Sequence, residues 1–73
     1  MIQKQVGKRI KEIRLSLNLS QEDCALNSGL NRTYFGSVER GERNISVINL
    51  NKICKSFKVS LKDFFNSKLF TGE

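Results

Sequence analysis

The residues best suited to chemistry lie between Asn31 and Gly41, where polar and apolar side chains alternate at helical spacing. Phe35 and Val38 are three positions apart, so we expect both to face the inside of a short helix. The outer side then carries Arg32, Thr33, Gly36 and Ser37. An arginine can donate two hydrogen bonds to guanine, a threonine methyl can contact thymine, and a serine hydroxyl can reach a base or a sugar. This pattern favours contact with the edges of DNA bases.

Other kinds of chemistry find little support. The chain has no histidine, the commonest general base in enzymes and a common zinc ligand. Cys24 and Cys54 stand 30 positions apart without a Cys-x-x-Cys pair, and both fill apolar helix positions. The glycines match neither a dinucleotide-binding nor a phosphate-loop spacing. We therefore expect no enzyme, no metal site and no cofactor.

The charge of the chain indicates a polyanionic partner. The formal net charge is +6 on 73 residues, so nucleic acid is the first candidate partner and an anionic membrane the second. The charge is uneven, at +4 for residues 1–19, −1 for residues 20–44 and +3 for residues 45–73. Flanking lysines would then hold phosphates while a few other residues read bases. Solvated basic faces would give the same pattern.

Helices must position these residues. The apolar residues Ile2, Val6, Ile10, Ile13 and Leu17 form one stripe of a helix over 2–17. Four later helix starts share one pattern, in which a Ser or Asn cap follows an apolar residue that packs on another apolar residue four positions beyond the cap. The caps are Ser20, Asn31, Ser46 and Ser60.

These signals predict helices at about 2–17, 21–28, 32–40, 47–56 and 61–67, and hence an all-α fold. The fourth helix would carry Val47, Leu50, Ile53, Cys54 and Phe57 on one face. We expect the whole chain, residues 1–73, to form a single domain. The sequence has neither a signal-peptide pattern nor a membrane-spanning run, so we expect no membrane association and a cytoplasmic location.

The connection between the second and third helices is very short. Gly29 can supply the left-handed backbone that such a turn needs. Ala25 is small enough to let the two helices approach, which is typical of a helix-turn-helix whose second helix enters the DNA major groove. An ordinary helical hairpin within a bundle would use a similar connection.

The segment from Gln21 to Gly41 resembles the helix-turn-helix family of the phage repressors and Cro proteins. Residues Asn31–Asn44 are more narrowly similar to the controller proteins of bacterial restriction–modification systems. The resemblance implies a compact, five-helix, lambda-repressor-like domain that binds an operator as a homodimer. It also implies control of the protein's own gene and of an endonuclease gene.

The same resemblance assigns roles to three further residues. Arg43, just past Gly41, would contact a base or the DNA backbone. Arg14 and Glu39 match the positions that form a partly buried ion pair in the repressor family. We expect this pair to hold the first helix against the reading helix.

Backbone contacts are expected around two helix starts and beside the reading face. Backbone N–H groups at a helix N-terminus favour phosphate. The expected backbone-contacting residues are Gln21, Tyr34, Asn44, Ser46 and Asn49.

The end of the chain is rich in large apolar residues. Phe64 is expected in the core, which leaves three residues to be covered: Phe65, Leu69 and Phe70. Such a cluster is typical of an interface, here with a second copy of the chain. A tail that folds back onto its own core is the alternative.

Other functions remain open at this point. A prophage repressor or an antitoxin-like regulator would share the same features, and a protein–protein docking module would share the fold. Because no ligand pocket is evident from the sequence, we expect no small-molecule ligand and control by dimer concentration.

Overall fold

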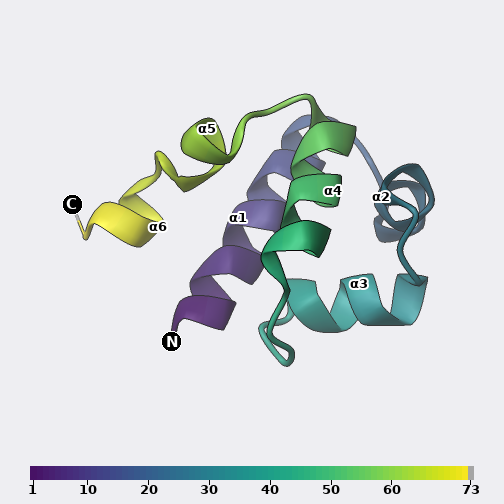
Figure 1. Cartoon of the computed structure of the whole chain (residues 1–73), viewed down its shortest axis with the longest axis horizontal. Helices are drawn as coiled ribbons and strands as arrows, with labels where there is room; N and C mark the ends of the chain where they lie inside the picture. The colour runs from purple at the N-terminus through teal and green to yellow at the C-terminus, as the bar shows by residue number, and fades with distance from the viewer. Residues whose placement is uncertain (73) are drawn as a thin grey trace.

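The computed structural model describes residues 1–72, which form six α-helices and no strand (Figure 1). The helices are α1 (Ile2–Ser16), α2 (Gln21–Ser28), α3 (Arg32–Glu39), α4 (Val47–Phe57), α5 (Leu61–Phe65) and α6 (Lys68–Thr71). Helix α1 packs against α3 and α6, α2 packs against α3 and α4, and α4 packs against α5. None of these helices has the length and apolar character needed to span a membrane.

Each of the four expected caps begins a helix. The side chains of Ser20, Asn31, Ser46 and Ser60 each accept a hydrogen bond from the backbone N–H three residues further along. At Ser20 the bond is reciprocal, because the Asp23 carboxylate accepts from the Ser20 backbone N–H. These bonds satisfy N–H groups that the first turn of a helix leaves without a partner. The predicted helix starts are therefore confirmed.

Helix ends explain why the connections are so short. Gly29 and Gly41 both adopt positive φ, at 72° and 76°, directly after α2 and at the end of α3. Leu30 then donates its backbone N–H to the carbonyl of Ala25, which closes α2. Leu30 is also the apolar residue before the Asn31 cap and packs against the core. One residue therefore ends α2 and helps to begin α3.

The hydrophobic core is formed by side chains from α1, α2, α3, α4 and α5. Its fully buried large side chains are Ile10, Phe35, Val38, Ile53 and Phe64. Both cysteines are buried and free, as their apolar positions predicted, and burial raises the pKa of each thiol.

The ends of two predicted apolar stripes are exposed. Ile2 and Leu17, at the two ends of the predicted stripe, are 59 % and 45 % exposed. Val47 is 73 % exposed, so its predicted place on the buried face of α4 is wrong. Val47 is the first residue of α4, where the helix has only begun to approach the core.

The tail differs from the single predicted helix over 61–67. Helix α5 ends at Phe65 because Asn66 leaves helical geometry, with φ −81° and ψ 74°. The Ser67 side chain then accepts from the Leu69 backbone N–H and begins α6. The predicted count of five helices is one too few, because no helix was predicted beyond residue 67.

Helix α1 approaches the end of α3 unusually closely at Gly7. A Cβ atom at this position would lie 2.4 Å from the Glu39 carbonyl oxygen and 2.6 Å from that of Val38. Such distances are far below van der Waals contact, so only a glycine allows the two helices to meet here.

We predict that Gly7→Ala destabilises the protein, although alanine is the better helix former by about 1 kcal/mol. The clash with two backbone carbonyls should cost about 1–3 kcal/mol, as overpacking does elsewhere. Chemical denaturation measures the free energy of unfolding. Lys8→Ala, at the exposed neighbouring position of α1, is the matched control and should change stability by less than about 0.5 kcal/mol. A Gly7→Ala variant as stable as the control would disprove the close approach.

Candidate DNA interface

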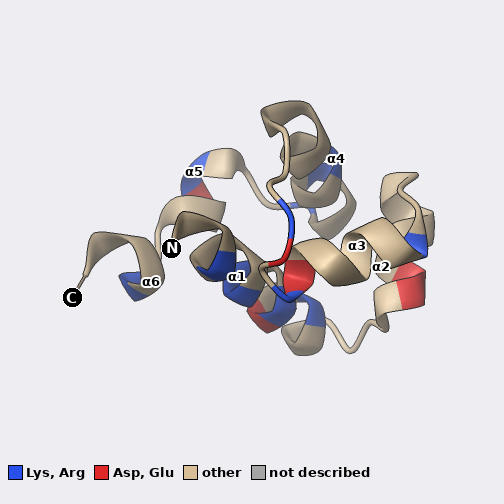
Figure 2. Ribbon diagram, turned by 90° about the horizontal axis from the view of Figure 1, so that it is seen from below, with Lys and Arg blue, Asp and Glu red and all other residues tan. Residues whose placement is uncertain are grey.

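Helices α2 and α3 form a helix-turn-helix with three connecting residues, 29–31. Phe35 and Val38 each expose only 1 % of their surface, which fixes the side of α3 that faces the core. The predicted inward face of this helix is thus confirmed. Figure 2 shows that little charge lies along α3 itself, whereas basic residues gather along α1.

The outer side of α3 presents the predicted reading residues unequally. Arg32 and Thr33, in its first turn, are exposed. Ser37 is only 8 % exposed, and its hydroxyl donates a 2.7 Å hydrogen bond to the Tyr34 carbonyl oxygen. Ser37 still borders a surface hollow together with Thr33 and Arg43. Arg32 and Thr33 are therefore the predicted reading residues most accessible to a base. The Ser37 hydroxyl, which already donates its hydrogen, can act mainly as a hydrogen-bond acceptor.

Tyr34 joins two residues that the sequence places far from it. The Asn49 amide nitrogen donates a 3.2 Å hydrogen bond to the Tyr34 hydroxyl oxygen. The Arg43 guanidinium carbon lies 5.8 Å from the centroid of the tyrosine ring, which is a cation–π distance. Because Asn49 is the donor in this bond, the phenolic hydrogen stays free to donate to an anion such as a phosphate. We call Tyr34, Arg43 and Asn49 the tyrosine cluster.

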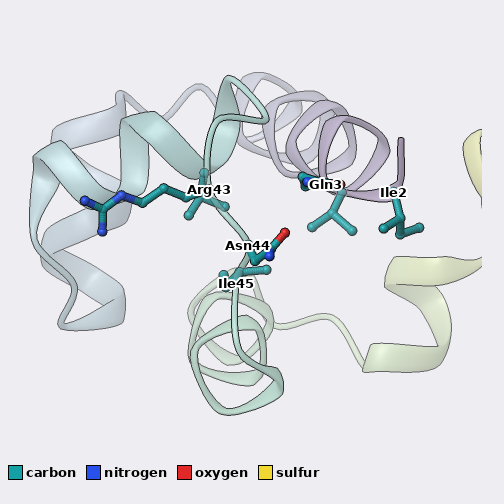
Figure 3. A pocket seen from close by; sticks show the side chains of 7 residues that line it. Ile2, Gln3, Arg43, Asn44 and Ile45 are labelled. Atoms are coloured by element: carbon teal, nitrogen blue, oxygen red, sulfur yellow. The ribbon is translucent and has the colours of Figure 1, made fainter.

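Neighbouring residues of the α3–α4 loop point in different directions. In Figure 3, Arg43 extends away from a hollow between this loop and the start of α1, whereas Asn44 lines that hollow together with Gln3 and Ile2. The hollow measures about 200 Å³, below the range of about 300–1,000 Å³ that small-molecule sites occupy. The Ser46 hydroxyl is engaged as the α4 cap. Asn44 and Ser46 therefore lie outside the tyrosine cluster.

A buried ion pair holds the helix-turn-helix against α1. The Arg14 Nε and Nη2 atoms donate to the two carboxylate oxygens of Glu39, each at 2.8 Å. The Gln21 amide nitrogen donates to the same Glu39 Oε1 at 3.1 Å. Burial alone would raise the pKa of the Glu39 carboxyl, but the hydrogen bonds from Arg14 and Gln21 outweigh it, and this pKa lies below its ordinary value. The hydrogen bond to Glu39 raises the pKa of Arg14.

Gln21 therefore turns its amide nitrogen inward and its carbonyl oxygen outward. That oxygen borders a hollow of about 220 Å³ that is also lined by Arg32, Thr33, Gly36 and Arg40. A Cβ atom at Gly36 would lie 3.1 Å from Arg40 Nη1 and 3.4 Å from Gln21 Oε1. Sequence reasoning missed Arg40. The sequence signal for Arg40 is Gly36, one helical turn earlier, because a residue without a side chain leaves room for the Arg40 guanidinium.

The predicted dimer residues form an aromatic cluster on the tail. The Phe65 ring makes edge-on contacts with Phe64 and Phe70, at centroid distances of 5.0 and 4.9 Å. Phe65 is 39 % exposed, whereas Leu69 and Phe70 are half-buried and Phe70 packs against the chain's own core. The tail thus folds back in part and still leaves Phe65 open. Residues 1–72 hold no group of three or more His, Cys, Asp or Glu side chains suited to a metal ion.

Comparisons with known proteins agree on one family. Residues 10–64 match the family described as helix-turn-helix. Control protein C.BamHI of Bacillus amyloliquefaciens is 44 % identical over 61 residues, covering 82 % of this chain and 75 % of that protein. Control protein C.SmaI of Serratia marcescens is 43 % identical over 56 residues, covering 77 % of this chain and 67 % of that protein.

Solved structures give the same result. The restriction–modification controller protein C.AhdI from Aeromonas hydrophila has a TM-score of 0.83 at 40 % identity, covering 86 % of this chain and 96 % of that one. The controller protein C.Esp1396I, solved as a tetramer in complex with its natural 35-base-pair operator, has a TM-score of 0.88 at 38 % identity. That match covers 97 % of this chain and 92 % of the other.

We predict that Glu39→Ala and Arg14→Ala each lower the free energy of unfolding by about 3–5 kcal/mol, because either change leaves a buried charge without its partner. Urea denaturation at neutral pH measures this loss. The matched control is Glu42→Ala, which breaks the exposed pair with Arg40 and should cost less than about 1 kcal/mol.

The contribution of Glu39 should also depend on pH. Its folded pKa is depressed, so this stabilisation is complete above the ordinary value of 4.5 and is lost as the pH falls through the lower folded value. The stability gap between wild type and Glu39→Ala should therefore narrow in acid. Equal unfolding midpoints for wild type and both variants at neutral pH would show that the pair contributes nothing.

Proposed function

The chain belongs to the helix-turn-helix family, among the restriction–modification control proteins, and from this premise we propose that it is a sequence-specific DNA-binding regulator of transcription. It would act in the cytoplasm as a homodimer on a double-stranded operator. Like a controller protein, it would regulate its own gene and that of a restriction endonuclease. The protein is not an enzyme.

The exposed first turn of α3, bordered by donors, carries this proposal. Arg32 and Thr33 lie in the open where a helix entering the major groove meets base edges. The tyrosine cluster lies beside them and offers the Tyr34 hydroxyl hydrogen and the Arg43 guanidinium. Gln21, with its backbone N–H at the start of α2, lies on the other side, next to the free guanidinium edge of Arg40. Base contacts are thus flanked by phosphate contacts on both sides.

A second copy of the chain completes the proposed site. Phe65 is an exposed aromatic residue on a tail in which Phe64 is buried and Phe70 packs against the core. Two copies joined through this surface would place two reading helices in successive major grooves, which requires a separation of about 34 Å. Occupancy of the operator would then rise steeply with protein concentration, with no need for a ligand. Asn44 and Ser46 would contact the DNA backbone near the start of α4.

We predict that Arg32→Ala weakens binding to the cognate site by about 1–3 kcal/mol and relaxes the preference for one base pair in each half-site. Titrations of cognate and random duplexes at several salt concentrations measure both effects. Lys58→Ala, which removes an equal charge from the far end of α4, is the control. If Arg32→Ala loses equal affinity for cognate and random DNA, Arg32 contacts phosphate and does not read a base.

We predict that Asn49→Ala weakens binding to all duplexes similarly, by about 0.5–1.5 kcal/mol, because the Tyr34 hydroxyl that Asn49 orients contacts a phosphate. Competition between duplexes of different sequence gives the test. Asn51→Ala, two positions further along α4 than Asn49, is the matched control and should bind as wild type does. A change in the preferred sequence without a general loss would contradict this assignment.

We predict that the wild type dimerises at micromolar concentration and that Phe65→Ala weakens the dimer, because a buried aromatic anchor is lost. Leu69→Ala should act in the same direction but more weakly, since its side chain is already half-buried within the monomer. Sedimentation equilibrium over a range of concentrations measures the association. A dimer that neither substitution affects would rule out this surface.

A further inference from the structure

Two polar side chains of α1 donate hydrogen bonds to the backbone of the tail, which consists of α5 and α6. Arg9 Nε donates to the Phe64 carbonyl oxygen at 2.7 Å, and Arg9 Nη2 donates to the Asp63 carbonyl oxygen at 2.9 Å. One turn earlier on the same face of α1, the Gln5 amide nitrogen donates to the Leu69 carbonyl oxygen. We call Gln5 and Arg9 the α1 clamp. Its three hydrogen bonds join residues that are 54 to 64 positions apart in the sequence, and they hold both α5 and α6.

Apart from the α1 clamp, the tail is held mainly by the apolar contacts of Phe64 and Phe70 with the core. Helix α5 has five residues and α6 has four, far below the length at which a helix is stable alone in water. Phe64 is the buried residue of α5, and α6 has none. The last carbonyls of a helix have no partner within it, and a planar guanidinium can serve two adjacent carbonyls at once. The Arg9 bond to the Phe64 carbonyl is partly buried, so water competes less for it than for the exposed bond to the Asp63 carbonyl.

The same helix also holds the reading helix. Gly7 touches the last carbonyls of α3, and Arg14 forms the ion pair with Glu39. Arg14 lies five positions after Arg9, a rise of about 7.5 Å along the helix. Helix α1 is therefore a short rigid link between the tail surface and α3. In Figure 1 it lies between α5 and α6 on one side and the α2–α3 pair on the other.

We propose that Gln5 and Arg9 are positioning residues for dimerisation. The α1 clamp holds the aromatic cluster of Phe64, Phe65 and Phe70 in the one orientation in which a second copy of the chain can dock. Through α1 it also sets the distance between the two reading helices. This inference rests on the proposed function, since it requires that the chain dimerises through the tail.

The test measures dimerisation and DNA binding separately. Sedimentation equilibrium compares wild type with Arg9→Ala, Arg9→Lys and Gln5→Ala, and circular dichroism verifies that each variant is folded. Each protein is then titrated with a duplex that carries one selected half-site and with a duplex that carries two. Lys8→Ala, the exposed neighbour of Arg9, matches the loss of charge without touching the tail.

The α1 clamp predicts that the dimer dissociation constant rises about tenfold or more in Arg9→Ala, since two charge-assisted hydrogen bonds are lost. Arg9→Lys should lie between Arg9→Ala and wild type, because an ammonium group cannot donate to both carbonyls with the geometry of a guanidinium. Affinity for the two-half-site duplex should fall in the same order. Affinity for the single half-site should match that of Lys8→Ala.

Two results would overturn the inference. The first is a dimer constant for Arg9→Ala and Arg9→Lys that equals that of Lys8→Ala. The second is an equal loss on the one-half-site and two-half-site duplexes, which would make Arg9 a phosphate contact. In either case the proposed dimer itself stands. A wild type that stays monomeric at high micromolar concentration would instead remove the dimer and the α1 clamp together.

Discussion

The rest of the structure depends on the hydrogen bonds that the buried Glu39 carboxylate accepts. This carboxylate accepts hydrogen bonds from Arg14 of α1 and Gln21 of α2 while it belongs to α3, so one buried group joins three helices. A buried charge is costly unless its partners are complete, and in residues 1–72 no buried side-chain nitrogen or oxygen lacks a hydrogen-bond partner. Gly7 brings α1 close enough for this arrangement to form. The orientation of α3 toward solvent, and hence the exposure of Arg32 and Thr33, follows from it.

Local chemistry made most of the fold predictable. Each cap is a Ser or Asn flanked by apolar residues at fixed offsets, and each acts within four residues of its own position. Gly29 and Gly41 likewise reveal their left-handed geometry, since other residues rarely adopt it. The inward positions of Phe35 and Val38 follow from helical periodicity. Local pattern gave the wrong result at two places. At Val47 the periodic pattern extends beyond the buried part of the helix, and at Asn66 the backbone leaves helical geometry and ends α5.

Contacts between distant residues could not be derived from local pattern. The hydrogen bond from Asn49 to Tyr34 joins residues 15 positions apart, and that from Gln5 to Leu69 joins residues 64 apart. Both depend on how helices pack, and neither has a signature within one turn of helix. The ion pair of Arg14 and Glu39 was reachable only through family resemblance. For Ser37, the position on the helix could be predicted from the sequence. The hydrogen bond that its hydroxyl donates to the Tyr34 carbonyl oxygen could not.

The central claim is that two copies of this chain read one symmetric DNA site through α3. Selection of bound duplexes from a pool of random sequence tests it most directly. The account predicts enriched sites with two related half-sites, their centres about 10 base pairs or a multiple of that apart, and a guanine at one fixed position in each half for Arg32. A single unrepeated motif, or no enrichment over the starting pool, would contradict the claim.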